Sequence, residues 1–249
     1  MPKRLSYQLY SSRNFPPLKD TLAMLAKIGY REVEGFGDVY DKPAAVRRLL
    51  DRNGLAMPTG HFSVDMLQNE RPTVLDIAKT LGVRHIYAPY LMADMRPKSA
   101  AGWKTFGRRL AAIGQWVRSE GFTFGWHNHD FEFVKLPTGE TPLDLMFAAA
   151  PMVDWECDVA WVARAGANPV TWIKRYAHRI TSVHVKDIAP KGQCADEDGW
   201  ADVGQGTVNW TACFAALKNS RALHYIMEHD NPNNDERFAR RSFDSVSKI

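Results

Sequence analysis

Histidine, carboxylate and lysine side chains recur at the ends of several apolar segments of this chain. Residues 125–133 read GWHNHDFEF, and three later segments contain WECDVAW, SVHVKD and YIMEHD. Neutral imidazoles and carboxylates are the groups with which proteins hold Mn²⁺, Zn²⁺, Co²⁺ or Fe²⁺. A carboxylate or an amine beside such an ion could also transfer protons. These residue types therefore predict one divalent metal ion in an active site.

Many of these polar residues fall in pairs separated by one position. Side chains two apart on a strand face the same way, so both members of a pair can lie on one face. The pairs are His127 with His129, Glu156 with Asp158, His184 with Lys186, and Glu228 with Asp230. If one member of each pair points toward a common mouth, oxygen and imidazole ligands converge there from four strands.

Three residues on three different segments predict the metal site most directly, namely Asp158, His184 and Glu228. His127 is either a further ligand or a hydrogen-bonded structural histidine. Earlier in the chain, Glu34 and His61 also end strand-like segments. We expect His61 to contact substrate, and Glu34 either to contact substrate or to form a salt bridge.

Strand-like runs alternate with amphipathic helical runs along the whole chain. The strand-like runs are residues 4–11, 30–37, 55–64, 83–90, 122–133, 152–161, 179–189 and 223–231. The helical runs are residues 17–29, 41–54, 73–82, 100–121, 141–150, 169–178, 209–220 and 235–249. Eight strand–helix units predict an α/β fold, a (β/α)8 TIM barrel that forms a single domain over residues 1–249.

A barrel of this type gives the paired residues a common location. Its active site lies at the carboxyl ends of the strands and in the loops that follow. The competing doubly wound sheet would carry a glycine-rich phosphate turn after its first strand, where this chain reads YSSRNFPP. The longest irregular stretch, residues 189–206, is expected to lie over the barrel mouth.

Composition argues against several other classes of protein. The net charge is +4, and no lysine and arginine run is long enough to predict a nucleic-acid partner. No apolar run approaches the roughly 18 residues that span a membrane, and no signal peptide is visible. The 3 cysteines show no CxxC spacing and are expected to be reduced thiols. We expect a cytoplasmic protein, and a homo-oligomer is an open possibility.

Four segments together resemble the sugar phosphate isomerase/epimerase family of the xylose-isomerase-like barrel superfamily. They are GWHNHDFEF (125–133), WECDVAWVARAGANPVTWIKRYAHRITSVHVKD (155–187), DVGQGTVNW (202–210) and YIMEHD (225–230). The resemblance implies one divalent metal ion held by Glu, Asp, His and Glu. The last three ligands match Asp158, His184 and Glu228. The first falls on or beside His127, so an imidazole replaces the carboxylate there, or the carboxylate moves to Glu132.

The resemblance also implies a reaction. The expected activity is that of a metal-dependent isomerase or epimerase, which moves a proton next to the carbonyl of a keto-sugar or related polyol through a metal-stabilised enediolate. Glu228 and Lys186 are the candidates for proton transfer, with Glu132 and His129 in reserve. The alternatives are a metal-dependent carbon–oxygen lyase, similar to the dehydratases of the family, and a non-catalytic sugar-binding barrel. A nuclease would need more metal ligands and a basic face.

The expected substrate is a small carbohydrate. Glu34, His61, His129 and Trp161 are the candidate contacts to it. The aromatic side chains of Trp126, Trp161 and Trp200 either stack on a sugar ring or pack in the barrel wall.

Overall fold

The computed structural model describes residues 4–248. Eight parallel strands close into a barrel in the order β1-β10-β7-β6-β5-β4-β3-β2, which confirms the predicted TIM barrel. The barrel strands are β1 (Arg4–Gln8), β2 (Glu32–Gly35), β3 (Ala56–His61), β4 (His85–Ala88), β5 (Thr123–His127), β6 (Asp154–Asp158), β7 (Ile180–Val185) and β10 (His224–Met227). Two further strands, β8 (Asp187–Ile188) and β9 (Trp200–Ala201), form a small antiparallel pair beside the barrel.

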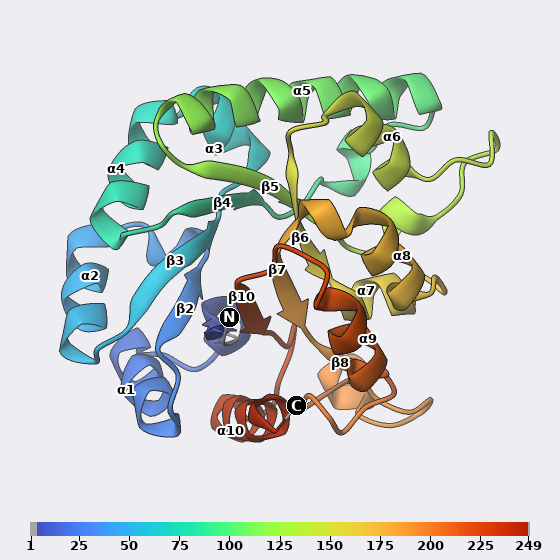
Figure 1. Ribbon diagram of the computed structural model, residues 1–249. Helices are drawn as coiled ribbons and strands as arrows, with labels where there is room; N and C mark the ends of the chain where they lie inside the picture. Colours follow the sequence, from blue (N-terminus) through green and yellow to red (C-terminus); the bar gives the residue numbers. More distant parts are fainter. Residues whose placement is uncertain (1–3, 249) are drawn as a thin grey trace.

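Helices form a ring around the strands (Figure 1). They are α1 (Leu18–Ile28), α2 (Pro43–Arg52), α3 (Val64–Asn69), α4 (Arg71–Leu81), α5 (Ala100–Ser119), α6 (Pro142–Ala149), α7 (Val159–Arg164), α8 (Pro169–Tyr176), α9 (Trp210–Leu217) and α10 (Asp235–Ser247). Several begin where a side-chain oxygen accepts a backbone N–H of the first turn, as Ser99 does for α5 and Asn234 for α10. The main core lies between this ring and the strands.

The strands that carry the polar residues are shorter than the sequence pattern predicts. Strand β5 ends at His127, and Phe131–Phe133 form a 3-10 turn instead of continuing the strand. Strand β6 ends at Asp158, whose carboxylate accepts the backbone N–H of Trp161 and so begins helix α7. Short polar side chains such as Asp158 offer the backbone local hydrogen bonds that compete with a strand ladder. After β5, the carboxylate of Glu132 accepts the backbone N–H of His129 and stabilises the turn.

The barrel interior is polar through much of its height. Near the amino ends of the strands, His224 Nδ1 lies 2.6 Å from Glu32 and His85 Nδ1 lies 2.7 Å from Thr123. Above them, the ring of Tyr87 crosses the interior, and its hydroxyl lies 2.8 Å from the Ser182 hydroxyl. A side chain at Gly125 would collide with this ring, since a Cβ there would lie 2.6 Å from it. The site described below rests on this polar floor.

Residues 189–206 do not lie over the barrel mouth as expected. The segment contains β9 and is fastened to α10, because Arg237 forms ion pairs with Glu197 and Asp202. None of its residues lines the cavity at the mouth. Asp187 accepts the backbone N–H groups of Gly204 and Val208, and these bonds fold the segment back along the barrel wall.

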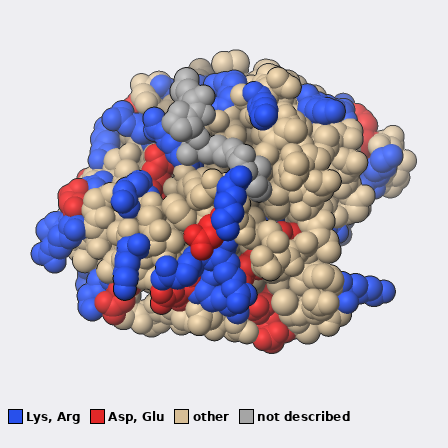
Figure 2. All heavy atoms as spheres, turned by 60° about the horizontal axis from the view of Figure 1, so that its bottom comes forward, with Lys and Arg blue, Asp and Glu red and all other residues tan. Residues whose placement is uncertain are grey.

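The outer surface carries both signs of charge. On the face drawn in Figure 2, lysine and arginine side chains alternate with aspartate and glutamate. Among residues 4–248, no helix has the length and apolar character needed to cross a membrane.

Candidate metal centre

Two overlapping groups of side chains that could hold a metal ion lie at the carboxyl end of the barrel. The inner group is His61, His127, Glu156 and His184, and the outer group is His127, Asp158, His184 and Glu228. In each group, one ligand atom per residue lies within 4.8 Å of all the others, and every residue is buried. The outer group is the ligand set that the sequence predicts. The inner group adds Glu156, to which the sequence analysis gives no ligand role.

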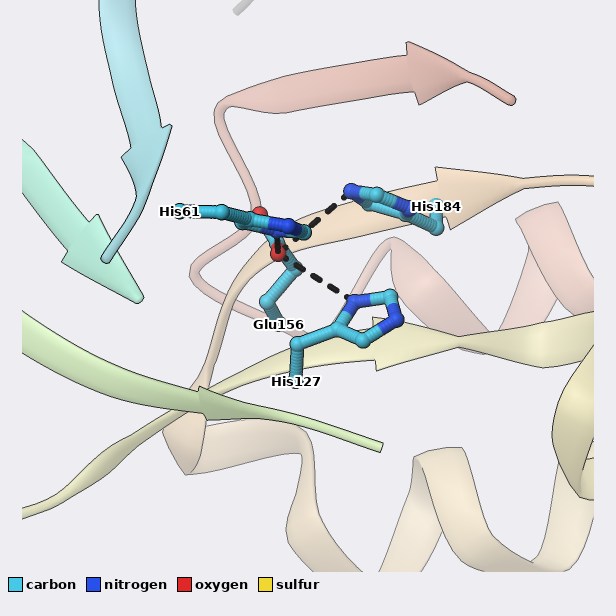
Figure 3. A group of neighbouring side chains, drawn as sticks. All are labelled: His61, His127, Glu156 and His184. Carbon is cyan, nitrogen blue, oxygen red and sulfur yellow. Dashed lines mark hydrogen bonds and ion pairs between the residues drawn. The ribbon is translucent and has the colours of Figure 1, made fainter. Parts of the chain in front are cut away.

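In the inner group, three imidazoles surround one carboxylate oxygen (Figure 3). Glu156 Oε2 lies 2.5 Å from His61 Nε2, 3.3 Å from His127 Nδ1 and 3.4 Å from His184 Nε2. The rings of His61 and His184 are stacked, with centroids 5.3 Å apart. These residues come from β3, β5, β6 and β7, so barrel closure alone brings them together.

The outer group opens toward the barrel mouth. His184 Nδ1 lies 2.8 Å from Glu228 Oε2, while its Nε2 lies 2.6 Å from Glu34 Oε1. Asp158 Oδ2 and His127 Nδ1 are buried without a hydrogen-bond partner. Buried polar atoms are nearly always satisfied in folded proteins, so orphaned atoms on two neighbouring candidate ligands fit a site built for a cation.

Lys186 lies among the outer carboxylates. Its ammonium is 3.1 Å from Glu228, 2.5 Å from Asp230 and 3.8 Å from Asp158. Burial lowers the pKa of Lys186, but the three carboxylates outweigh burial, so that the pKa lies above its usual value. At neutral pH this lysine is therefore a cation that can donate a proton, and it is not a free amine that could remove one.

The outer carboxylates differ in protonation. Burial raises the pKa of Glu228, but Lys186 and His184 outweigh it and hold the pKa well below its usual range. Burial raises the pKa of Asp158 to about 7, although Lys186 and His184 lower it. Glu228 is therefore the permanent carboxylate of this group, and Asp158 carries its charge when a cation lies next to it.

Glu34 is a buried partner of the histidines and has no contact with the cavity. Its Oε1 accepts a hydrogen bond from Gln8 Nε2 at 2.8 Å and lies 3.2 Å from His61 Nε2. Burial raises the pKa of Glu34, but His61 and His184 outweigh it and lower the pKa to about 2. The geometry supports the ion-pair interpretation of Glu34, and its contact to substrate stays a prediction.

The segment GWHNHDFEF divides its polar residues between the cavity and the barrel wall. His127 and His129 line the cavity, and burial lowers the pKa of His129 to about 3, so its ring is neutral. Asn128 is buried and binds strand β6, because its Oδ1 accepts Trp155 Nε1 at 2.8 Å and the backbone N–H of Asp158 at 2.9 Å.

Glu132, a candidate base or metal ligand, lies in the barrel wall and not with the two donor groups. One of its oxygens accepts Trp126 Nε1 at 2.9 Å, and the other accepts the backbone N–H of His129 at 3.0 Å. It is fully buried and does not line the cavity. Because β5 stops at His127, the chain turns and carries Glu132 into the wall, where it closes the turn. In the outer group, the candidate ligand from β5 is therefore His127.

A cavity of about 640 Å³ opens above the two groups. His61, His127 and Glu228 form part of its floor, and Tyr10, Phe36, Tyr90 and Trp161 line its walls. His61, His129 and Trp161, the remaining candidate contacts to substrate, all line this cavity. Trp126 packs against Phe106 in the core, and Trp200 is buried behind Trp161, so these two indoles have the packing role.

The family model of the xylose isomerase-like TIM barrel matches residues 22–249. This chain belongs to that family. Members of the superfamily are enzymes, among them isomerases, epimerases and dehydratases.

Two characterised relatives align with parts of this family member. The rhizopine catabolism protein MocC of Rhizobium meliloti is 27% identical over 190 residues, which cover 69% of this chain and 58% of MocC. An inosose dehydratase of Clostridium botulinum is 30% identical over 89 residues, which cover 36% of this chain and 30% of that enzyme. The aligned parts thus span less than two thirds of either relative.

Solved structures agree with the barrel. A sugar phosphate isomerase/epimerase from Parabacteroides distasonis superposes with a TM-score of 0.82 at 20% identity, over 99% of this chain and 94% of that one. The IOLI protein with a bound zinc atom superposes with a TM-score of 0.75 at 18% identity, over 98% of both chains. At these identities the likeness establishes the shared fold.

Proposed function

We propose that this protein is a divalent-metal-dependent isomerase or epimerase that acts on a keto-sugar or a related polyol. The observation that carries the proposal is the outer donor group, in which His127, Asp158, His184 and Glu228 meet at the base of a cavity large enough for a sugar. The IOLI protein, which shares this fold, binds a zinc atom, and this supports a bound cation in the present chain. Mn²⁺, Zn²⁺, Co²⁺ and Fe²⁺ all accept such a mixed set of nitrogen and oxygen ligands.

The proposed reaction is proton transfer at a carbon next to a carbonyl. A divalent ion held by the outer group would polarise the substrate carbonyl and make that proton more acidic. Glu228 reaches the cavity as a carboxylate and is the candidate base. Lys186 is buried and does not line the cavity, but its ammonium contacts Glu228 and Asp230, which do. It stays protonated, so that it holds Glu228 as a carboxylate and can return a proton to the site through these side chains.

The cavity walls suit a carbohydrate. Aromatic faces such as those of Tyr10 and Trp161 can cover the apolar C–H side of a sugar ring, while His61 and Asp230 offer polar atoms for its hydroxyl groups. His129 is neutral and lies with its ring centroid 5.1 Å from that of Trp161, so the two side chains form one wall.

The test of catalysis is proton exchange. Wild-type protein loaded with Mn²⁺ is incubated with a panel of keto-sugars in D2O, and incorporation of deuterium next to the carbonyl is measured by NMR. We expect exchange with at least one sugar and its loss in a Glu228→Gln variant. Saturable sugar binding without exchange across the whole panel would instead identify a sugar-binding barrel.

The proposed metal site is tested separately, by measuring the metal content of the purified protein. Metal content is determined after purification for the wild type and for an Asp158→Ala/His184→Ala double variant. We expect the double variant to lose the bound ion. Equal metal content in the two proteins would show that the outer group is not the site.

A carbon–oxygen lyase is the second candidate, favoured by the similarity to an inosose dehydratase and by the position of Lys186. Lys186 could supply, through Asp230, the proton for a hydroxyl that leaves from the carbon next to the one that loses its proton, because it contacts Asp230 and Asp230 lines the cavity. Release of water from an oxidised sugar or cyclitol gives an unsaturated ketone, which absorbs in the ultraviolet. A new absorbance without an epimeric product would favour this reaction over epimerisation.

A further inference from the structure

The inner donor group is more than a support for the outer one. His61, His127, Glu156 and His184 are all buried, and each comes from a different barrel strand. His127 Nδ1 and Glu156 Oε1 have no hydrogen-bond partner in the structure. Two orphaned atoms in one closed cluster need a ligand that the protein itself does not supply.

The spacing of this group fits a small four-coordinate cation. Two ligands of a tetrahedral ion with bonds of about 2.0–2.1 Å lie about 3.3–3.4 Å apart. Glu156 Oε2 lies 3.3 Å from His127 Nδ1 and 3.4 Å from His184 Nε2. Its contact to His61 Nε2, at 2.5 Å, is a hydrogen bond that would lengthen by about 1 Å around an ion with such bonds.

The inner group also differs chemically from the outer one. It offers three imidazoles and one carboxylate, whereas the outer group offers two of each. Imidazole-rich sites favour Zn²⁺ and Co²⁺ over the oxygen-preferring Mn²⁺ and Mg²⁺. The ion pairs of Lys186 reach Asp158, Glu228 and Asp230 and do not include Glu156, so this ammonium opposes a cation in the outer group more strongly.

Glu34 adds negative charge to the inner group. Its Oε1 lies 3.2 Å from His61 Nε2 and 2.6 Å from His184 Nε2, the same two nitrogens that face Glu156 Oε2. An ion bound by these nitrogens would replace those contacts, and this second carboxylate would lie beside the ion and offset its charge.

His184 links the two groups. Its Nε2 faces Glu34 and Glu156, and its Nδ1 faces Glu228. His127 also belongs to both groups. An ion that binds all four inner residues therefore leaves only Asp158 and Glu228 free in the outer group. An ion that binds all four outer residues leaves only His61 and Glu156 free in the inner group.

We propose that His61, His127, Glu156 and His184 form a second, inner metal position that takes an imidazole-preferring divalent cation such as Zn²⁺ or Co²⁺, and that the inner and outer positions are occupied one at a time. The proposal does not depend on the reaction proposed above. It predicts that different cations rest at different depths in the same barrel.

Anomalous X-ray scattering from crystals of the wild-type protein tests the position directly. Metal-free crystals are soaked with Co²⁺ alone, with Zn²⁺ alone and with Mn²⁺ alone. We expect the Co²⁺ and Zn²⁺ peaks to lie within bonding distance of His61 and Glu156, and the Mn²⁺ peak beside Asp158 and Glu228. Co²⁺ and Zn²⁺ peaks in the outer group alone would overturn the inner position and leave the proposed enzyme standing. A peak in the inner group of a protein that shows no proton exchange would support the inner position and overturn the proposed reaction.

Solution binding gives a second measurement with matched variants. Titration of metal-free protein with Co²⁺ is followed by calorimetry and by visible absorption, which reports tetrahedral coordination. His61→Gln and Glu156→Gln should weaken Co²⁺ binding at least about tenfold, since even partners behind a ligand contribute that much. Asp158→Asn should leave the Co²⁺ affinity and spectrum close to those of the wild type. If Asp158→Asn abolishes the Co²⁺ spectrum while both inner variants keep it, the proposal is wrong.

Discussion

Asn128 is predicted to be the main structural link between the ends of β5 and β6. Its Oδ1 accepts two hydrogen bonds, from Trp155 Nε1 at 2.8 Å and from the backbone N–H of Asp158 at 2.9 Å. Its Nδ2 donates to the backbone oxygen of Asp158 at 3.1 Å. In an Asn128→Ala variant, these three buried groups of the partner strand lose their partner together.

The size of the effect follows from these bonds. Each hydrogen bond contributes about 1 kcal/mol net, and a buried group left unsatisfied costs about 1–3 kcal/mol. Three such groups give a loss of roughly 3–5 kcal/mol if part of the deficit is met by relaxation or by water. For a protein of this size, that corresponds to a fall in Tm of roughly 6–20 °C.

Urea unfolding of the metal-free protein measures this loss. Asn69→Ala is the control, because Asn69 is exposed and bonds only to Asp65, so its change should stay within about 0.5 kcal/mol. A double-mutant cycle with Trp155→Phe isolates the indole bond, since the cavity made by the phenylalanine occurs in both arms. We expect a coupling of about 1 kcal/mol between Asn128 and Trp155. If the losses in unfolding free energy of the Asn128 and Trp155 variants are additive, or if Asn128→Ala costs less than about 1 kcal/mol, Asn128 is not the link between β5 and β6.

Three further predictions concern charge. Lys186→Met should destabilise the metal-free protein by about 3–5 kcal/mol, because it leaves buried carboxylates without their cation. The same change should tighten Mn²⁺ binding, because it removes a positive charge from the outer group. Weaker Mn²⁺ binding in calorimetry would contradict this prediction. Glu34→Gln should lower metal affinity about 10–100-fold through loss of its bond to His184, whereas Glu32→Gln, two residues away on β2, should not change that affinity. Burial and the neighbouring His224 lower the pKa of His85 to about 4, so its contribution to stability is present above pH 6.5 and lost as pH falls toward 4. His85→Gln should therefore flatten the pH dependence of unfolding in this window by up to about 1.4 kcal/mol per pH unit, and an unchanged slope would show that this histidine is not the cause.

The sequence by itself determined the barrel and three members of the outer donor group, Asp158, His184 and Glu228. Eight alternations of apolar periodicity leave few folds other than a TIM barrel, and in that fold the ends of all strands meet on one side. Asp158, His184 and Glu228 could therefore be brought together without knowledge of any distance, because strand order alone places them on neighbouring strands β6, β7 and β10.

Tertiary structure decided which side chain of each polar pair meets which partner. The sequence could not place Glu132 in the wall, since this follows from where β5 stops and where the chain turns. It also could not show that Glu156 meets His61, 95 residues away, because β3 and β6 are not neighbours and only closure of the barrel brings their side chains into contact. Protonation was likewise decided in three dimensions, because burial opposes the charges of Lys186 and Glu228. Each keeps its charge because groups of opposite charge lie beside it, Asp230 and Glu228 beside Lys186, and Lys186 and His184 beside Glu228. Spacing along a chain reports which face a residue occupies, whereas contacts across a closed barrel depend on its curvature and on every strand register at once.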